Sequence, residues 1–72
     1  MKLSRAEIKN ILDHVRTGRY MTDEVESALY EYFLGNGEMP YGIAKARDGD
    51  PYTWISDRLE EMGEDEIVEA FS

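Results

Sequence analysis

The chain has 72 residues, of which 16 are Asp or Glu and 8 are Lys or Arg, and its formal net charge is −8. A chain of this length buries only about 60% of the surface that it exposes when unfolded, so it holds one core and little scaffold for a catalytic cleft. It contains no Cys and one His, which excludes a disulfide framework, a thiolate metal site and a His-rich zinc site. We therefore expect one compact domain over residues 1–72, with no metal and no cofactor.

The N-terminal residues run directly into a helical pattern, and no apolar stretch approaches the roughly 18 residues that a membrane span requires. We expect a soluble, unprocessed protein without membrane contact. The missing cysteines allow a reducing compartment, so the expected location is the cytoplasm, or the host cytoplasm if a phage encodes the chain.

The first predicted helix follows a capping box of Ser4 and Glu7, with Leu3 placed for a hydrophobic staple. Gly18 provides the left-handed residue that ends it. Between them, apolar residues recur at helical spacing at Ile8, Ile11, Leu12 and Val15.

A second helix starts at a cap of Thr22 or Asp23, and acidic residues in its first turn complement the helix dipole. Gly35-Asn36-Gly37 ends it. Its buried stripe consists of Val25, Ala28, Leu29, Tyr32 and Phe33.

The sequence of residues 38–50 predicts one or two turns of helix that begin at Pro40, followed by a reverse turn. Asp50-Pro51 then predicts a cap and the first residue of a further helix, which runs to Gly63. The predicted inner face of this helix consists of Tyr52, Trp54, Ile55, Leu59 and Met62.

Residues 64–72 allow two states, a last docked helix with Ile67, Val68 and Phe71 facing the core, or a flexible acidic tail that orders only on binding. The predicted fold is all-α, a small bundle of three to five short helices.

Charge is distributed unevenly along the chain. Residues 1–20 carry five basic side chains against two acidic ones, and residues 45–59 carry three of each sign. Residues 21–44 carry five acidic side chains and residues 60–72 carry six, with no Lys or Arg in either segment. The two acidic blocks are either solvated faces that favour solubility or an anionic surface for a positively charged groove.

The outward face of the second helix combines carboxylates one turn apart with hydroxyl groups, an arrangement that imitates spaced phosphates. Exposed tyrosines are enriched at protein interfaces. Together these features predict the partner-binding residues Asp23, Glu24, Ser27, Tyr30, Glu31, Tyr41, Glu60, Glu61, Asp65 and Glu66.

The chain lacks the usual groups of enzyme chemistry, because there is no Cys, no phosphate-cradling glycine loop and no sequence partner for His14. We expect His14 at the surface.

Ile43-Ala44, followed by Gly49 and Ile55, resembles a helix-turn-helix with a turn one residue longer than usual. In that alternative, the residues facing a DNA groove are Tyr52, Thr53, Ser56 and Asp57.

In size and charge the chain is similar to the acidic inhibitors that phages use against host CRISPR or restriction enzymes, some of which mimic DNA. That similarity implies a non-enzymatic protein that blocks a basic, nucleic-acid-handling protein or complex, without binding nucleic acid itself. The alternatives are a DNA-binding regulator of the helix-turn-helix kind and a protein assembly module, monomeric or a homodimer through Trp54 or Phe71.

Overall fold

The structure is a computed structural model and describes residues 1–46 and 48–72. Within that range the chain forms four helices and no strand, which confirms the predicted all-α bundle. Arg47, counted above among the basic residues of 45–59, lies outside the described residues. The helices are α1 (Arg5–Thr17), α2 (Asp23–Gly35), α3 (Tyr41–Ala44) and α4 (Asp50–Phe71).

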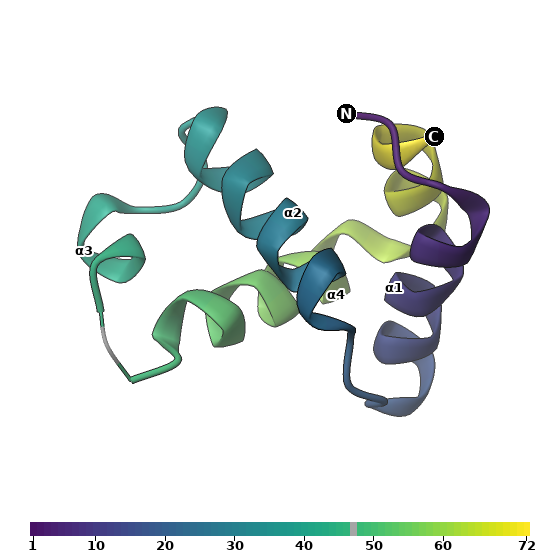
Figure 1. The fold of residues 1–72 in the computed structure, drawn as a ribbon, viewed down its shortest axis with the longest axis horizontal. Coiled ribbons are helices and arrows are strands. Elements are labelled where there is room, and N and C mark those ends of the chain that lie inside the picture. Colours follow the sequence, from purple (N-terminus) through teal and green to yellow (C-terminus); the bar gives the residue numbers. More distant parts are fainter. Residues whose placement is uncertain (47) are drawn as a thin grey trace.

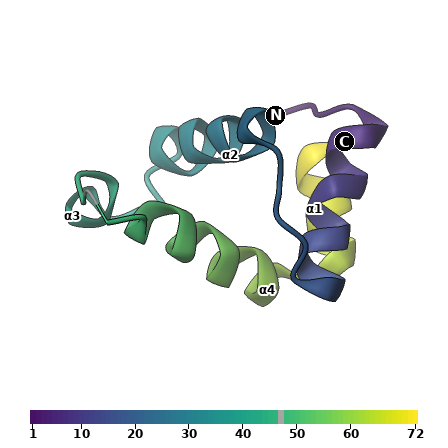
Figure 2. The same cartoon turned by 60° about the horizontal axis from the view of Figure 1, so that its bottom comes forward.

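α4 is bent into two arms at Gly63, where φ is 81° and ψ is 166°. A positive φ of this kind is accessible to glycine because it has no Cβ. We call residues 50–62 the N-terminal arm and residues 64–71 the C-terminal arm. The N-terminal arm faces α2 across the molecule, and the C-terminal arm lies beside α1 (Figures 1 and 2).

The helix starts follow local capping. Ser4 Oγ accepts a hydrogen bond from the Glu7 amide at 3.1 Å, and Glu7 Oε1 accepts one from the Ser4 amide at 2.9 Å, which confirms the capping box. Thr22, rather than Asp23, caps α2 by accepting from the Val25 amide.

The predicted start of α4 is wrong by one residue. Gly49 is the cap, Asp50 the first helical residue and Pro51 the second. Gly49 has a φ of 77°, in the left-handed region that glycine tolerates, and the proline lacks only an N–H that the first turn leaves unpaired anyway.

α1, α2 and α4 supply the buried helical residues of one hydrophobic core, and Ile43 and Ala44 of α3 pack against it. The ring of Phe33 in α2 is completely buried and makes edge-on contacts with Trp54 and Phe71, with ring centroids 5.3 Å and 6.5 Å apart. The most deeply buried side chains are Ile11, Val25, Leu29, Phe33, Ile55, Leu59, Ile67 and Phe71.

Two residues predicted for inner faces are exposed. Val68 is 42% exposed, since it lies about 100° around the helix from the buried Ile67. Tyr52 is 45% exposed, and its ring lies 6.4 Å from that of Tyr30 instead of entering the core.

Of the two states that the sequence allows for residues 64–72, the structure has the docked helix. Ile67 and Phe71 are completely buried. The Leu3 amide donates to the Phe71 carbonyl at 2.7 Å, which joins the two ends of the chain. The burial of Phe71 also removes this side chain from any dimer contact of the kind considered above.

Replacing Phe71 by Ala should lower the free energy of unfolding by about 3–5 kcal/mol, because it empties a fully buried aromatic site. Val68→Ala on the same arm should cost about 0.5 kcal/mol, because that side chain is partly solvated. Urea denaturation followed by circular dichroism measures both. Equal effects of the two substitutions would contradict docking of the C-terminal arm.

Candidate functional site

The outward face of α2 carries four of the predicted partner-binding residues. The helix turns the stripe of Val25, Leu29 and Phe33 into the core. Residues on the opposite side therefore point to solvent, because successive residues are rotated by about 100°. The side chains exposed there are Asp23, Glu24, Ser27 and Glu31, which we call the α2 face.

No carboxylate of the α2 face forms an ion pair with a residue that the structure describes. The basic N-terminal segment does not neutralise them: Lys9 pairs with Asp13, and Arg16 pairs with Glu64. Lys2 and Arg5 form no ion pair within the described chain. The carboxylates of the α2 face are therefore open to the cations of another molecule.

The other predicted acidic residues are exposed but lie elsewhere. Glu60 and Glu61 belong to the N-terminal arm of α4, and Glu61 Oε2 is 4.0 Å from Arg58 Nη1. Asp65 and Glu66 belong to the C-terminal arm. α2 and the N-terminal arm pack their apolar sides together, so their exposed faces point in opposite directions (Figure 2). The structure does not bring the two acidic blocks onto one flat surface.

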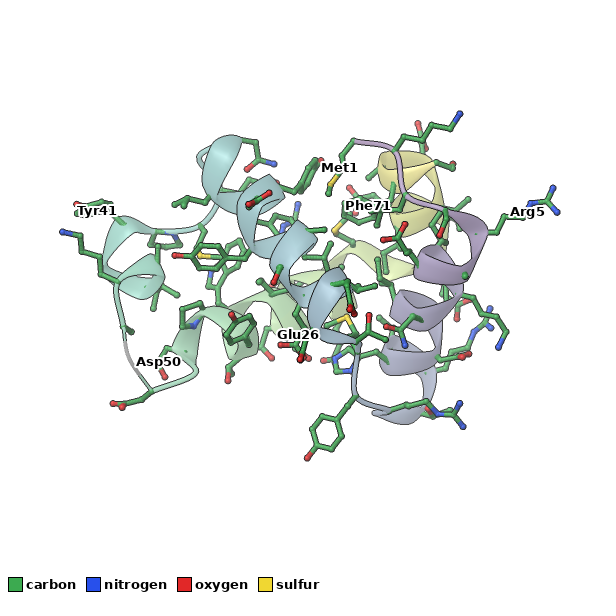
Figure 3. All side chains as sticks on the ribbon, in the orientation of Figure 1. Met1, Arg5, Glu26, Tyr41, Asp50 and Phe71 are labelled. Atoms are coloured by element: carbon green, nitrogen blue, oxygen red, sulfur yellow. The ribbon has the colours of Figure 1, made fainter. Side chains whose placement is uncertain are left out.

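The two predicted tyrosines differ in their surroundings. Tyr30 is half-buried and its hydroxyl donates to the Ala44 carbonyl at 2.9 Å, so it holds α3 against α2 and is wrongly predicted as an exposed contact. Tyr41 is 68% exposed, with Lys45 Nζ 4.5 Å from its ring centroid. It lies at the end of the molecule opposite Arg5 (Figure 3).

His14 is not the unpartnered surface residue that the sequence predicts. Its Nδ1 is 2.7 Å from the Arg19 carbonyl oxygen and therefore donates to it. Its Nε2 is 2.8 Å from Ser56 Oγ. The imidazole thus joins α1, the α1–α2 loop and the N-terminal arm of α4. No local spacing indicates this role, since His14 and Ser56 are 42 residues apart.

In the helix-turn-helix alternative, α3 would be the first helix of the motif. It has only four residues, which make a single helical turn. Ser56, which that alternative places in a DNA groove, is hydrogen-bonded to His14. Tyr52, Thr53 and Asp57 are exposed on the N-terminal arm.

No group of three His, Asp or Glu side chains in residues 1–46 and 48–72 is arranged to hold a metal ion. None of the helices described there is long and apolar enough to cross a bilayer.

The ion pair of Arg16 and Glu64 connects α1 to the start of the C-terminal arm. The hydrogen bond from Arg16 lowers the pKa of the Glu64 carboxyl below its ordinary value. The pKa of Glu64 is lower in the folded chain than in the unfolded chain. The ion pair therefore stabilises the fold at pH values above the ordinary pKa of a Glu side chain. This contribution disappears as the pH falls through the folded pKa.

In Arg16→Gln the pKa of Glu64 should return toward its ordinary value, and the free energy of unfolding should fall less steeply on acidification than in the wild type. Carboxyl-detected NMR titration and urea denaturation between neutral and acidic pH measure the two effects. Lys2→Gln is the matched control, because it removes the same charge from a residue without a described ion pair. An identical pH dependence for both variants would count against the assigned pair.

No protein-family model, no curated protein and no solved structure matches this chain. What the site binds has to be inferred from its own carboxylates, tyrosines and contacts.

Proposed function

We propose that the protein is a non-enzymatic acidic binding protein whose α2 face docks on a basic, nucleic-acid-handling protein and occludes its nucleic-acid groove. The observation that carries this proposal is the exposure of Asp23, Glu24 and Glu31 without an ion pair to any described residue. Carboxylates in this state accept charge-assisted hydrogen bonds from Arg and Lys, as phosphates do.

The spacing along α2 suits this role. Glu24 and Glu31 are seven residues apart, which corresponds to about 10 Å along a helix axis. Phosphates of one DNA strand advance by about 3.4 Å per step along the duplex axis, so the axial separation of the two carboxylates matches the axial advance of about three steps. Ser27 lies between them and adds a hydroxyl that both donates and accepts.

The charge of the whole chain supports the same interaction. A net charge of −8 on 72 residues attracts a positively charged partner over several ångströms and accelerates association at low salt. The carboxylates on the two arms of α4 contribute to this field without lying on the α2 face. Asp23 and Glu24 lie in the first turn, where negative charge complements the helix dipole. Glu31 lies beyond that turn, so the dipole does not account for its position.

Similarity in size and charge to phage inhibitors makes CRISPR and restriction enzymes the first partners to test. Direct DNA binding is the competing proposal, and it predicts a gel shift of random duplex DNA by the chain alone. The acidic-docking proposal predicts no such shift.

Glu24→Gln combined with Glu31→Gln should reduce binding to the partner by at least about fivefold, because two charge-assisted contacts are lost. The measurement has two steps. Affinity capture from a lysate at low and high salt identifies the partner, and displacement of a fluorescent duplex from the purified partner then gives the affinity. Wild-type capture should fail at high salt, because the interface is electrostatic.

Asp48→Asn combined with Glu69→Gln is the matched control, since it removes two exposed carboxylates outside the α2 face. Its displacement activity should stay within about twofold of the wild type. Salt-insensitive capture of a protein that binds no nucleic acid would overturn the proposal, as would equal loss in both double variants.

A further inference from the structure

A groove of about 270 Å³ opens between the α1–α2 loop, the N-terminal half of α2 and the N-terminal arm of α4. The buried side chains of Met21 and Ile55 contribute apolar surface to it. Tyr20 and Tyr52 also line it, and so do the acidic residues Glu26 and Asp57. Glu26 projects from the N-terminal half of α2 (Figure 3).

We infer that this groove binds an arginine side chain of the basic partner. The inference rests on the proposed function, because it takes the partner to be basic. It adds a specific contact that lies outside the α2 face.

The chemistry of the lining selects a flat cation. Neither Glu26 nor Asp57 forms an ion pair within the part of the chain that the structure describes. A guanidinium has five N–H donors in a plane, so it can hydrogen-bond to carboxylates while its face stacks on a tyrosine ring. Its methylene stem can lie on the apolar surface of Met21 and Ile55. A lysine ammonium matches the charge but lacks the planar donor set.

The two tyrosines of the groove, Tyr20 and Tyr52, are exposed to solvent. Tyr20 is 91% exposed and Tyr52 is 45% exposed. Aromatic side chains in such positions add contact area at an interface with little loss of conformational freedom. Each can therefore contact an incoming guanidinium without first leaving the core.

The groove is held in shape by bonds that do not involve a ligand. His14 contacts the Arg19 carbonyl, directly before Tyr20, and Ser56 on the opposite wall. Asn10 Oδ1 accepts from the Thr22 amide at 2.9 Å, directly after Met21. A preformed site loses less conformational entropy when it binds.

The inference is tested with two peptides of equal length, oligo-arginine and oligo-lysine, titrated into the full chain and followed by calorimetry and amide NMR shifts. The wild type should bind oligo-arginine about fivefold more tightly than oligo-lysine. Amide shifts should be largest for Tyr20, Glu26 and Asp57. Glu26→Gln combined with Asp57→Asn should abolish the preference, and Tyr20→Ala should reduce it about threefold.

Two double variants of equal charge separate this inference from the proposed function. Asp48→Asn with Glu69→Gln, and Glu24→Gln with Glu31→Gln, should weaken binding of both peptides while leaving the preference for arginine intact. Melting temperatures of all variants should stay close to that of the wild type, since every substituted side chain lies at the surface or on the groove wall. Only the first-turn residues Glu24 and Glu26 lose a small interaction with the helix dipole.

If the groove variant keeps the preference, or if the wild type has none, the arginine site is wrong while salt-dependent binding of basic partners stands. If oligo-arginine does not bind the wild type even at low salt, both proposals fail. Loss of the preference in the α2-face variant would move arginine recognition from the groove to that face, and so would overturn this inference.

Discussion

The burial of Phe33 between α2 and both arms of α4 is the contact on which the architecture depends. Its ring meets Trp54 of one arm and Phe71 of the other, and Tyr32 adds an edge-on contact with Phe71 at 5.0 Å. In a straight helix, Trp54 and Phe71 would lie about 25 Å apart, too far for one ring to touch both. The contacts of Phe33 with both arms therefore require the kink at Gly63.

The same contacts determine which charged side chains of α2 remain exposed to solvent. Once Phe33 turns the apolar stripe of α2 inward, the carboxylates on the other side of the helix point to solvent. The ion pairs within the described chain involve exposed or half-exposed side chains, and pairs of this kind add little to stability because water screens them. Stability rests on the apolar core, so the acidic surface is free to serve binding.

The two proposed contacts lie on neighbouring sides of one helix. Asp23 and Ser27 lie near the middle of the outward side of α2, while Glu26 lies about 100° around the axis from the buried Val25, on the flank toward the groove. A partner that covers the α2 face therefore reaches the groove over the first turns of the helix. Glu60 and Glu61, on the far side of the N-terminal arm, act on such a partner only through the long-range field.

The sequence by itself determined α1, α2 and the N-terminal arm of α4, together with the exposed carboxylates of α2. Capping at Ser4 and Thr22 involves residues three positions apart, and the stripe of Val25, Leu29 and Phe33 repeats within one helix. Patterns of this range are present in the local sequence, and for that reason their positions could be predicted. At the start of α4 the prediction was wrong by one residue, because Gly49 rather than Asp50 is the cap.

Only the tertiary structure decided how those helices are used. The bond of His14 to Ser56, the burial of Tyr30 against Ala44 and the groove beside Glu26 each join segments from different helices. Their existence depends on how α1, α2, α3 and the N-terminal arm of α4 pack against one another, and so on which residues meet across the core. Periodicity specifies which side of a helix is apolar, but the partner of each polar side chain depends on packing between segments that are distant in the sequence.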